Sequence, residues 1–160
     1  MQKLSTFHFG EIEFDEEKII KFPWGLPGFP DDTRFLLMSE KDDEDMFFWL
    51  QSADNGDVAF TLMNVYGVLP DYDPRVGQEA LDELGEMAEG PLEIYNIAVI
   101  PEDVRQMRVN LKAPVVINAD AGLGAQVVCE NEEYPIRYHI FEQLEKYRER
   151  GGQADAGANP

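Results

Sequence analysis

Along most of its length the chain alternates apolar and polar positions in short runs, as half-buried β-strands do. TFHFGEIEF (6–14) alternates around a glycine and predicts a strand or a bent strand. MFFWLQS (46–52) is mostly apolar and predicts a buried strand, which Asn55-Gly56 follows as a strong hairpin signal. The expected strands are 6–14, 18–22, 34–39, 46–52, 58–65, 92–100, 108–113 continued as 115–119, and 124–130.

Two segments change to the helical period. The internal segment 74–89 begins at Pro74 and has one apolar face with acidic residues largely on the other, which predicts an amphipathic helix. FEQLEKYRER (141–150) predicts a short C-terminal helix, and the small-residue segment 151–160 predicts a disordered tail. The apolar face of the internal helix would hold Val76, Ala80, Leu84, Met87 and Ala88.

These elements predict a mainly β protein, an antiparallel β-barrel-like domain of about eight strands. Residues 1–140 form this single domain in the prediction, and 141–150 form a helical extension. A chain of 160 residues favours one domain and can bury a core without a disulfide or a metal. Pro114 interrupts one apolar run, and because proline cannot donate to a strand ladder, we expect an edge or a bulge there.

The turn FPWGLPGF (22–29) is unusual because it combines turn residues with large apolar ones and carries no charge. One interpretation is a tight double turn that closes the barrel core; the other is an exposed apolar anchor for a partner. We expect a division, with Phe22 and Leu26 buried, and Trp24 and Phe29 exposed. The neighbouring acids Asp31 and Asp32 would form a polar rim around the exposed pair.

Charge narrows the possible partners. The formal net charge is −19, and residues 134–160 hold four basic and four acidic residues, so the whole excess lies in 1–133. Such a surface repels phosphate backbones, which argues against direct nucleic-acid binding. It attracts basic partners and speeds their encounter, although acidity that only maintains solubility is an equally open interpretation.

Candidate chemistry is sparse. His8 and His139 lie at opposite ends of the chain, which disfavours a metal pair, and the single cysteine, Cys129, ends an apolar strand as a buried thiol would. We therefore expect no enzyme activity, no metal and no cofactor. No apolar run is long enough for a signal peptide or a membrane span, so we expect a cytoplasmic protein without membrane contact.

Several stretches together resemble one family, the flagellar assembly factor FliW. The resemblance rests on GEIEFDEEKIIKFPWGLPGF (10–29), FFWLQSAD (47–54), VNLKAPVVINADAGLGAQVV (109–128) and NEEYPIR (131–137), in that order. It covers about residues 5–138 and leaves 141–160 unmatched.

The resemblance implies a non-enzymatic protein with a β-barrel-like fold and two partners. Members of the family bind flagellin and the homodimeric carbon storage regulator CsrA, a translational repressor of flagellin mRNA. They antagonise the repressor, and flagellin captures the factor in turn, which makes a partner switch. The alternatives are a flagellin chaperone without a regulatory role, and a small-molecule-binding barrel.

The residues expected to contact partners fall in two groups. Trp24 and Phe29 are the candidate anchors, with Asp31 and Asp32 beside them. An acidic loop and the acids of the internal helix would steer basic partners through their field. The loop acids are Asp42, Asp43, Glu44 and Asp45.

Overall fold

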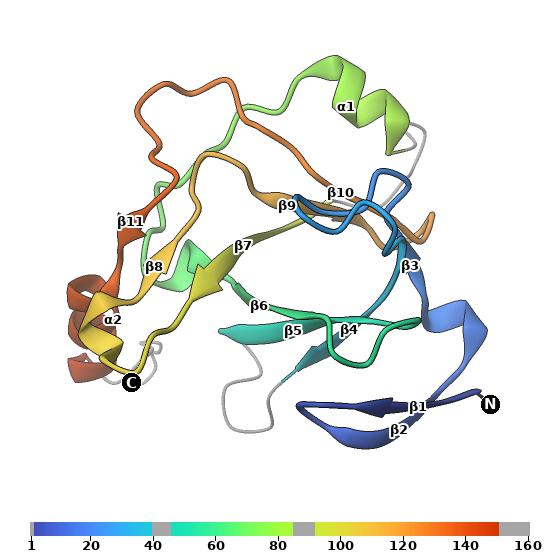
Figure 1. The fold of residues 1–160 in the computed structure, drawn as a ribbon. Helices are drawn as coiled ribbons and strands as arrows, with labels where there is room; N and C mark the ends of the chain where they lie inside the picture. The colour runs from blue at the N-terminus through green and yellow to red at the C-terminus, as the bar shows by residue number, and fades with distance from the viewer. Residues whose placement is uncertain (1, 40–45, 85–91, 151–160) are drawn as a thin grey trace.

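The protein is a closed β-barrel with an N-terminal hairpin below it and a C-terminal helix at one side (Figure 1). This is a computed structural model, and it describes residues 2–39, 46–84 and 92–150. Seven strands form the ring in the order β7, β6, β5, β4, β3, β10, β9, and the pairing of β9 with β7 closes it. Their bounds are β3 Ile20–Lys21, β4 Arg34–Ser39, β5 Phe47–Ser52, β6 Ala59–Met63, β7 Glu93–Val99, β9 Val115–Asn118 and β10 Leu123–Gln126.

The predicted antiparallel barrel class is confirmed. Among the described strands one pairing of the ring is parallel, that of β10 with β3 at Leu123 and Lys21. The described chain holds eleven strands, of which seven make the ring; the other four form the N-terminal hairpin and an extension of the sheet beyond the ring.

The run that Pro114 interrupts is a bulge. β7 pairs with β9 at Glu93–Tyr95 and with β8 (Arg108–Val109) at Ala98–Val99. Five residues separate β8 from β9, whereas two separate the paired parts of β7, so the extra backbone loops out of the ladder. The carbonyl of Pro114 accepts from the Val127 amide at 2.9 Å, which ties this bulge to the neighbouring chain. The last strand, β11 (Tyr138–His139), pairs with β8 and extends the sheet away from the ring.

The strand predicted at 6–14 is a hairpin instead. β1 (Gln2–Thr6) pairs antiparallel with β2 (Gly10–Phe14), so the turn falls inside the predicted strand. Gly10 has φ +67°, and the Thr6 hydroxyl donates to the Gly10 carbonyl and accepts from the Phe9 amide. This local side-chain bonding reverses the chain where alternation alone predicted continuity.

The internal helix is shorter than predicted. α1 covers Gln78–Glu83, while 74–77 is not helical and 85–91 lies outside the described residues. The Asn131 side chain accepts from the Arg75 amide at 2.7 Å and donates to the Asp73 carbonyl at 3.1 Å. The Arg75 carbonyl also accepts from the Glu130 amide, so tertiary hydrogen bonds hold this backbone out of the helix.

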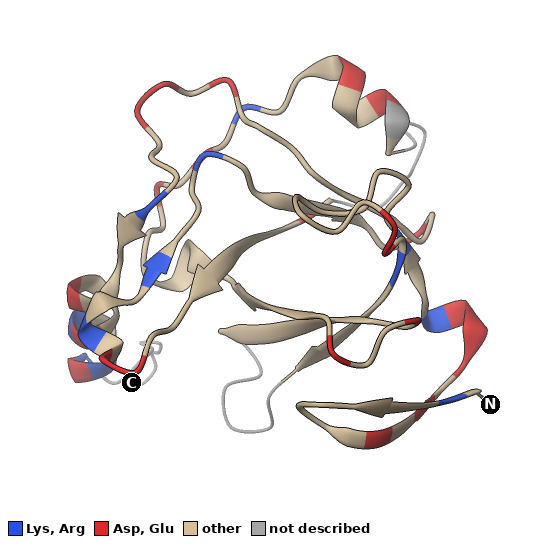
Figure 2. Cartoon of the chain, viewed as in Figure 1, with Lys and Arg blue, Asp and Glu red and all other residues tan. Residues whose placement is uncertain are grey.

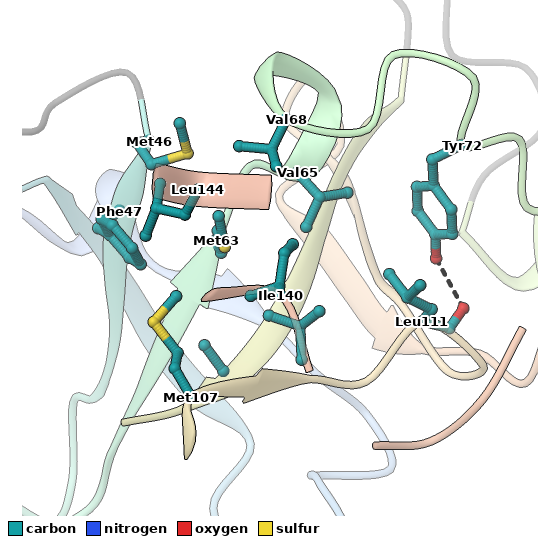
Figure 3. Close-up of a cluster of buried hydrophobic side chains, with 12 residues drawn as sticks. Met46, Phe47, Met63, Val65, Val68, Tyr72, Met107, Leu111, Ile140 and Leu144 are labelled. Carbon is teal, nitrogen blue, oxygen red and sulfur yellow. Dashed lines mark hydrogen bonds between the residues drawn. The ribbon is translucent and has the colours of Figure 1, made fainter. Parts of the chain in front are cut away.

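The core has two main parts. One fills the barrel with Phe22, Leu26, Phe35, Leu50, Leu62, Val115 and Ile117 among others. The other lies between the barrel and α2 (Phe141–Glu149), where Ile140 and Leu144 point toward Met46, Met63 and Met107 (Figure 3). The predicted C-terminal helix therefore packs on the barrel wall. Residues 151–160, predicted as a disordered tail, lie outside the described residues.

Candidate partner-binding surfaces

The turn 22–33 is built around two glycines in the left-handed region. Gly25 has φ +65° and Gly28 has φ +86°, a conformation that residues with an L side chain rarely adopt. Leu26 and Phe29 exchange backbone hydrogen bonds of 3.3 and 2.7 Å, which closes the second half of the turn. The Phe22 amide donates to Thr33, so both ends of the segment are joined as a continuation of the β3–β4 pairing.

The division of apolar side chains in this turn is as predicted. Phe22 and Leu26 are buried, and the Phe22 ring lies so close to Gly124 of β10 that a Cβ there would approach it to 2.6 Å. Trp24 is 52% exposed and Phe29 is 39% exposed. The ring of Phe29 meets Phe60 edge to face at 5.5 Å, so a fixed contact orients this half-open aromatic side chain.

The acids beside the turn differ in their surroundings. Asp31 is exposed, whereas Asp32 is half-buried and accepts a hydrogen bond of 2.9 Å from the Ser52 hydroxyl. Ser52 in turn accepts from the amides of Asp54 and Asn55, so Asp32 anchors the turn to the β5–β6 connection. This structural role was not expected from the sequence. The predicted acidic residues Asp42, Asp43, Glu44 and Asp45 lie outside the described residues.

Negative charge is distributed over many elements. Acidic segments mark β2, the 3-10 turn η1 (Glu16–Lys18), α1 and the loop before β11 (Figure 2). Of the acids predicted on the internal helix, Glu79 and Asp82 are exposed on α1. The acidic character thus surrounds the barrel and is not confined to the predicted loop.

A groove lined by tyrosines is the main feature that the sequence interpretation missed. It has a volume of about 400 Å³ and lies between the segment after β6 and the segment before β11. The Tyr72 ring meets Tyr66 at 5.7 Å and Tyr134 at 4.8 Å. The two Pro-Tyr-rich stretches VLPDYDP and EEYPIRY were the available signal, but more than fifty residues separate them in the chain. The lining comprises Val68, Leu69, Pro70, Asp71, Tyr72, Leu111, Glu133, Tyr134, Pro135 and Tyr138.

Tyr72 connects this groove to the bulge between β8 and β9. Its hydroxyl donates to the Leu111 carbonyl at 2.8 Å, drawn in Figure 3, and accepts from the Asn96 amide at 3.0 Å. Burial is the main cause that raises the pKa of the Tyr72 hydroxyl far above its ordinary value. The pKa of Tyr66 is also raised, by burial first and then by the charge of Asp73. Both hydroxyls stay neutral near pH 7, and Tyr72 adds an aromatic ring with a hydrogen-bonded hydroxyl to the groove wall.

The residues considered for catalysis are placed apart. His8 is exposed on the hairpin tip and lies against the Trp49 ring at 4.6 Å, and Cys129 is buried. Among the described residues no three His, Cys, Asp or Glu side chains are close enough to hold a metal ion. In the same part of the chain no helix has the length and apolarity needed to span a membrane.

Comparison with known proteins identifies the class of protein to which this fold belongs. A solved structure described as the flagellar assembly factor FliW superposes with a TM-score of 0.79 at 29% identity, covering 87% of this chain and 96% of that one. The family model of the FliW protein matches residues 3–140.

Curated relatives agree with this match. A flagellar assembly factor FliW of Alkaliphilus metalliredigens is 37% identical over 155 residues, which is 97% of this chain and 96% of the relative. One of Caldicellulosiruptor saccharolyticus is 42% identical over 136 residues, 85% of this chain and 88% of the relative. The chain belongs to the FliW family of flagellar assembly factors.

Proposed function

We propose that this protein is a non-enzymatic cytoplasmic regulator that binds flagellin and the repressor CsrA by turns. Bound to the repressor, it prevents silencing of flagellin mRNA; bound to accumulated flagellin, it leaves the repressor free. Membership of the flagellar assembly factor family is the observation that carries the proposal.

The charge of the protein supports a basic partner. A repressor that binds RNA must present a basic face, because phosphate neutralisation dominates such affinity. A partner with a formal net charge of −19 that docks beside this face lowers RNA affinity through its field without covering the RNA site. Coupling between two separate sites is reciprocal, so RNA weakens the binding of this protein by the same factor.

The turn 22–33 supports a specific contact. Trp24 and Phe29 are exposed aromatic side chains on a tight turn that two glycines permit and that paired backbone hydrogen bonds fix. Rigid aromatic anchors lose little conformational entropy on binding, which is why they dominate many interfaces. Asp31 provides an exposed acid next to them.

The proposal is tested by the affinity of purified CsrA for a flagellin mRNA leader, measured by gel shift with and without this protein. The expected result is weaker RNA binding that added flagellin restores. The antagonism, expressed as a ratio of affinities, should shrink between about 50 and 200 mM salt if the field carries it. Unchanged RNA affinity at every salt concentration would reduce the protein to a flagellin chaperone.

A further inference from the structure

One edge of β4 is unpaired over its second half. The Arg34 carbonyl accepts from the Ala53 amide of the β5 side, so even-numbered residues of β4 direct their backbone groups toward β5. Odd-numbered residues direct theirs the other way, where β3 pairs only with Arg34 and Phe35. In the register of the described strands, the backbone groups of Leu37 and Ser39 therefore face no partner strand.

The chain leaves this edge because of the 3-10 turn η1. The Lys18 and Ile19 amides bond back to Asp15 and Glu16, which curls the chain away just before β3 begins. A residue at the position of Lys18 in a continued strand would have paired with Leu37. The local sequence thus opens a gap in the sheet.

The gap is a groove of about 460 Å³ between the open edge of β4 and strand β2. Its apolar lining comes from Ile12 and Phe14 on one side and from Leu36, Leu37 and Met38 on the other. The hairpin that forms one wall is anchored at both ends. The Phe7 amide donates to the Gly56 carbonyl at its tip, and Phe14 packs with Leu36 and Ala53 at its root.

The rim of the groove is acidic. The segment 10–18 carries five acidic residues against Lys18 alone, and Glu13, Asp15 and Lys18 line the groove itself. Arg34, the nearest arginine of β4, already pairs with Glu16 and Asp54. Two acids against one lysine leave the lining net negative, which favours an occupant that carries positive charge.

We propose that this groove binds an extended segment of a partner protein in which apolar and basic residues alternate. The segment adds a strand to β4 through the backbone groups of Leu37 and Ser39. Its apolar side chains face the hairpin and contact Ile12 and Phe14, and the field of the acidic rim attracts its positive charge. A second copy of this acidic chain fits the rim less well, because both edges carry negative charge.

Amide hydrogen exchange resolved by NMR tests this directly. The probe is a capped peptide alternating lysine and valine over about seven residues, long enough for the groove at roughly 3.3 Å per residue. In the free protein, the Leu37 and Ser39 amides should exchange faster than those of Leu36 and Met38. Saturating peptide should slow the exchange of the Leu37 and Ser39 amides by about tenfold or more.

Matched controls test whether the charge of the peptide and the position of the acid determine binding. A peptide that alternates glutamate and valine should give the two amides no protection. Glu13→Lys should weaken the affinity for the lysine peptide by about threefold. Glu102→Lys changes the net charge equally on an exposed loop before β8 and should leave the affinity nearly unchanged. Protection of Leu37 and Ser39 that rises with protein concentration alone would assign the edge to a second copy and overturn the proposal.

Two other results overturn it: slow exchange of both amides in dilute protein, and no protection by the lysine peptide. The inference goes beyond the proposed partner switch and does not depend on it. Antagonism of CsrA can hold while this groove stays empty, and the peptide can bind here in a protein that never meets CsrA.

Discussion

Gly25 is the residue on which the geometry of the turn 22–33 depends most. It has φ +65°, and a Cβ there would lie 2.4 Å from the Phe29 carbonyl oxygen. Gly25→Ala should therefore lower the free energy of unfolding by more than the ~1–2 kcal/mol of the left-handed conformation alone. Gly28→Ala is the control, since Gly28 has φ +86° with open space around it. Equal losses for the two variants in urea unfolding would contradict this account of the turn.

Trp24 should matter more for binding than for stability. Because only about half of its side chain is buried, Trp24→Ala should lower the free energy of unfolding by about 1–2 kcal/mol, below the ~3–5 kcal/mol of a fully buried tryptophan. Its loss from an interface core should weaken the affinity for CsrA or flagellin about tenfold or more, as measured by calorimetry. Ile136→Ala removes a comparably exposed apolar side chain from another segment and should leave both affinities unchanged. Matching losses for the two variants would remove Trp24 as an anchor.

Tyr72 should make the protein sensitive to alkali. The folded state raises the pKa of its hydroxyl, so the neutral form is favoured there. This stabilisation is complete below the unfolded pKa of about 10 and is lost as the pH rises above it. The urea concentration at the midpoint of unfolding should fall as the pH rises above 9. For Tyr72→Phe this midpoint should fall less steeply with pH, although the variant is less stable than the unchanged protein at pH 8. The same slope in both proteins would exclude Tyr72 as the cause.

At the scale of elements, α2 should contribute to the stability of the whole barrel. Leu144 is buried in the cluster with Met46, Met63 and Met107. Leu144→Ala should lower the free energy of unfolding by about 2–5 kcal/mol, whereas Glu145→Ala on the exposed side should change it little. A loss below about 1 kcal/mol for Leu144→Ala in urea unfolding would show that α2 is a dispensable extension.

Elements with a regular pattern were predictable, and those shaped by distant contacts were not. β4 has the predicted bounds 34–39, because its continuous apolar run packs on both faces, one toward the barrel and one toward the hairpin. The predicted start of α1 was wrong because the side chain of Asn131, more than fifty residues away, forms hydrogen bonds with the backbone of Asp73 and Arg75. The β1–β2 turn was missed because the Thr6 side chain, not the apolar pattern, reverses the chain.

At the scale of the molecule, only surfaces made by one continuous segment were foreseen. The turn 22–33 carries its own signal, so the exposure of Trp24 and Phe29 followed from its composition. The tyrosine groove and the open edge of β4 each join segments far apart in the chain. No single-sequence pattern reports such a junction, because it depends on register and packing.

Titration calorimetry can show whether one protein exchanges two partners. The protein is titrated into purified CsrA dimer, first alone and then with flagellin present. With a partner switch, binding to CsrA is expected to be saturable, and flagellin should abolish it by competition. Binding to CsrA that is the same with saturating flagellin, or no binding to CsrA at all, would contradict the partner switch.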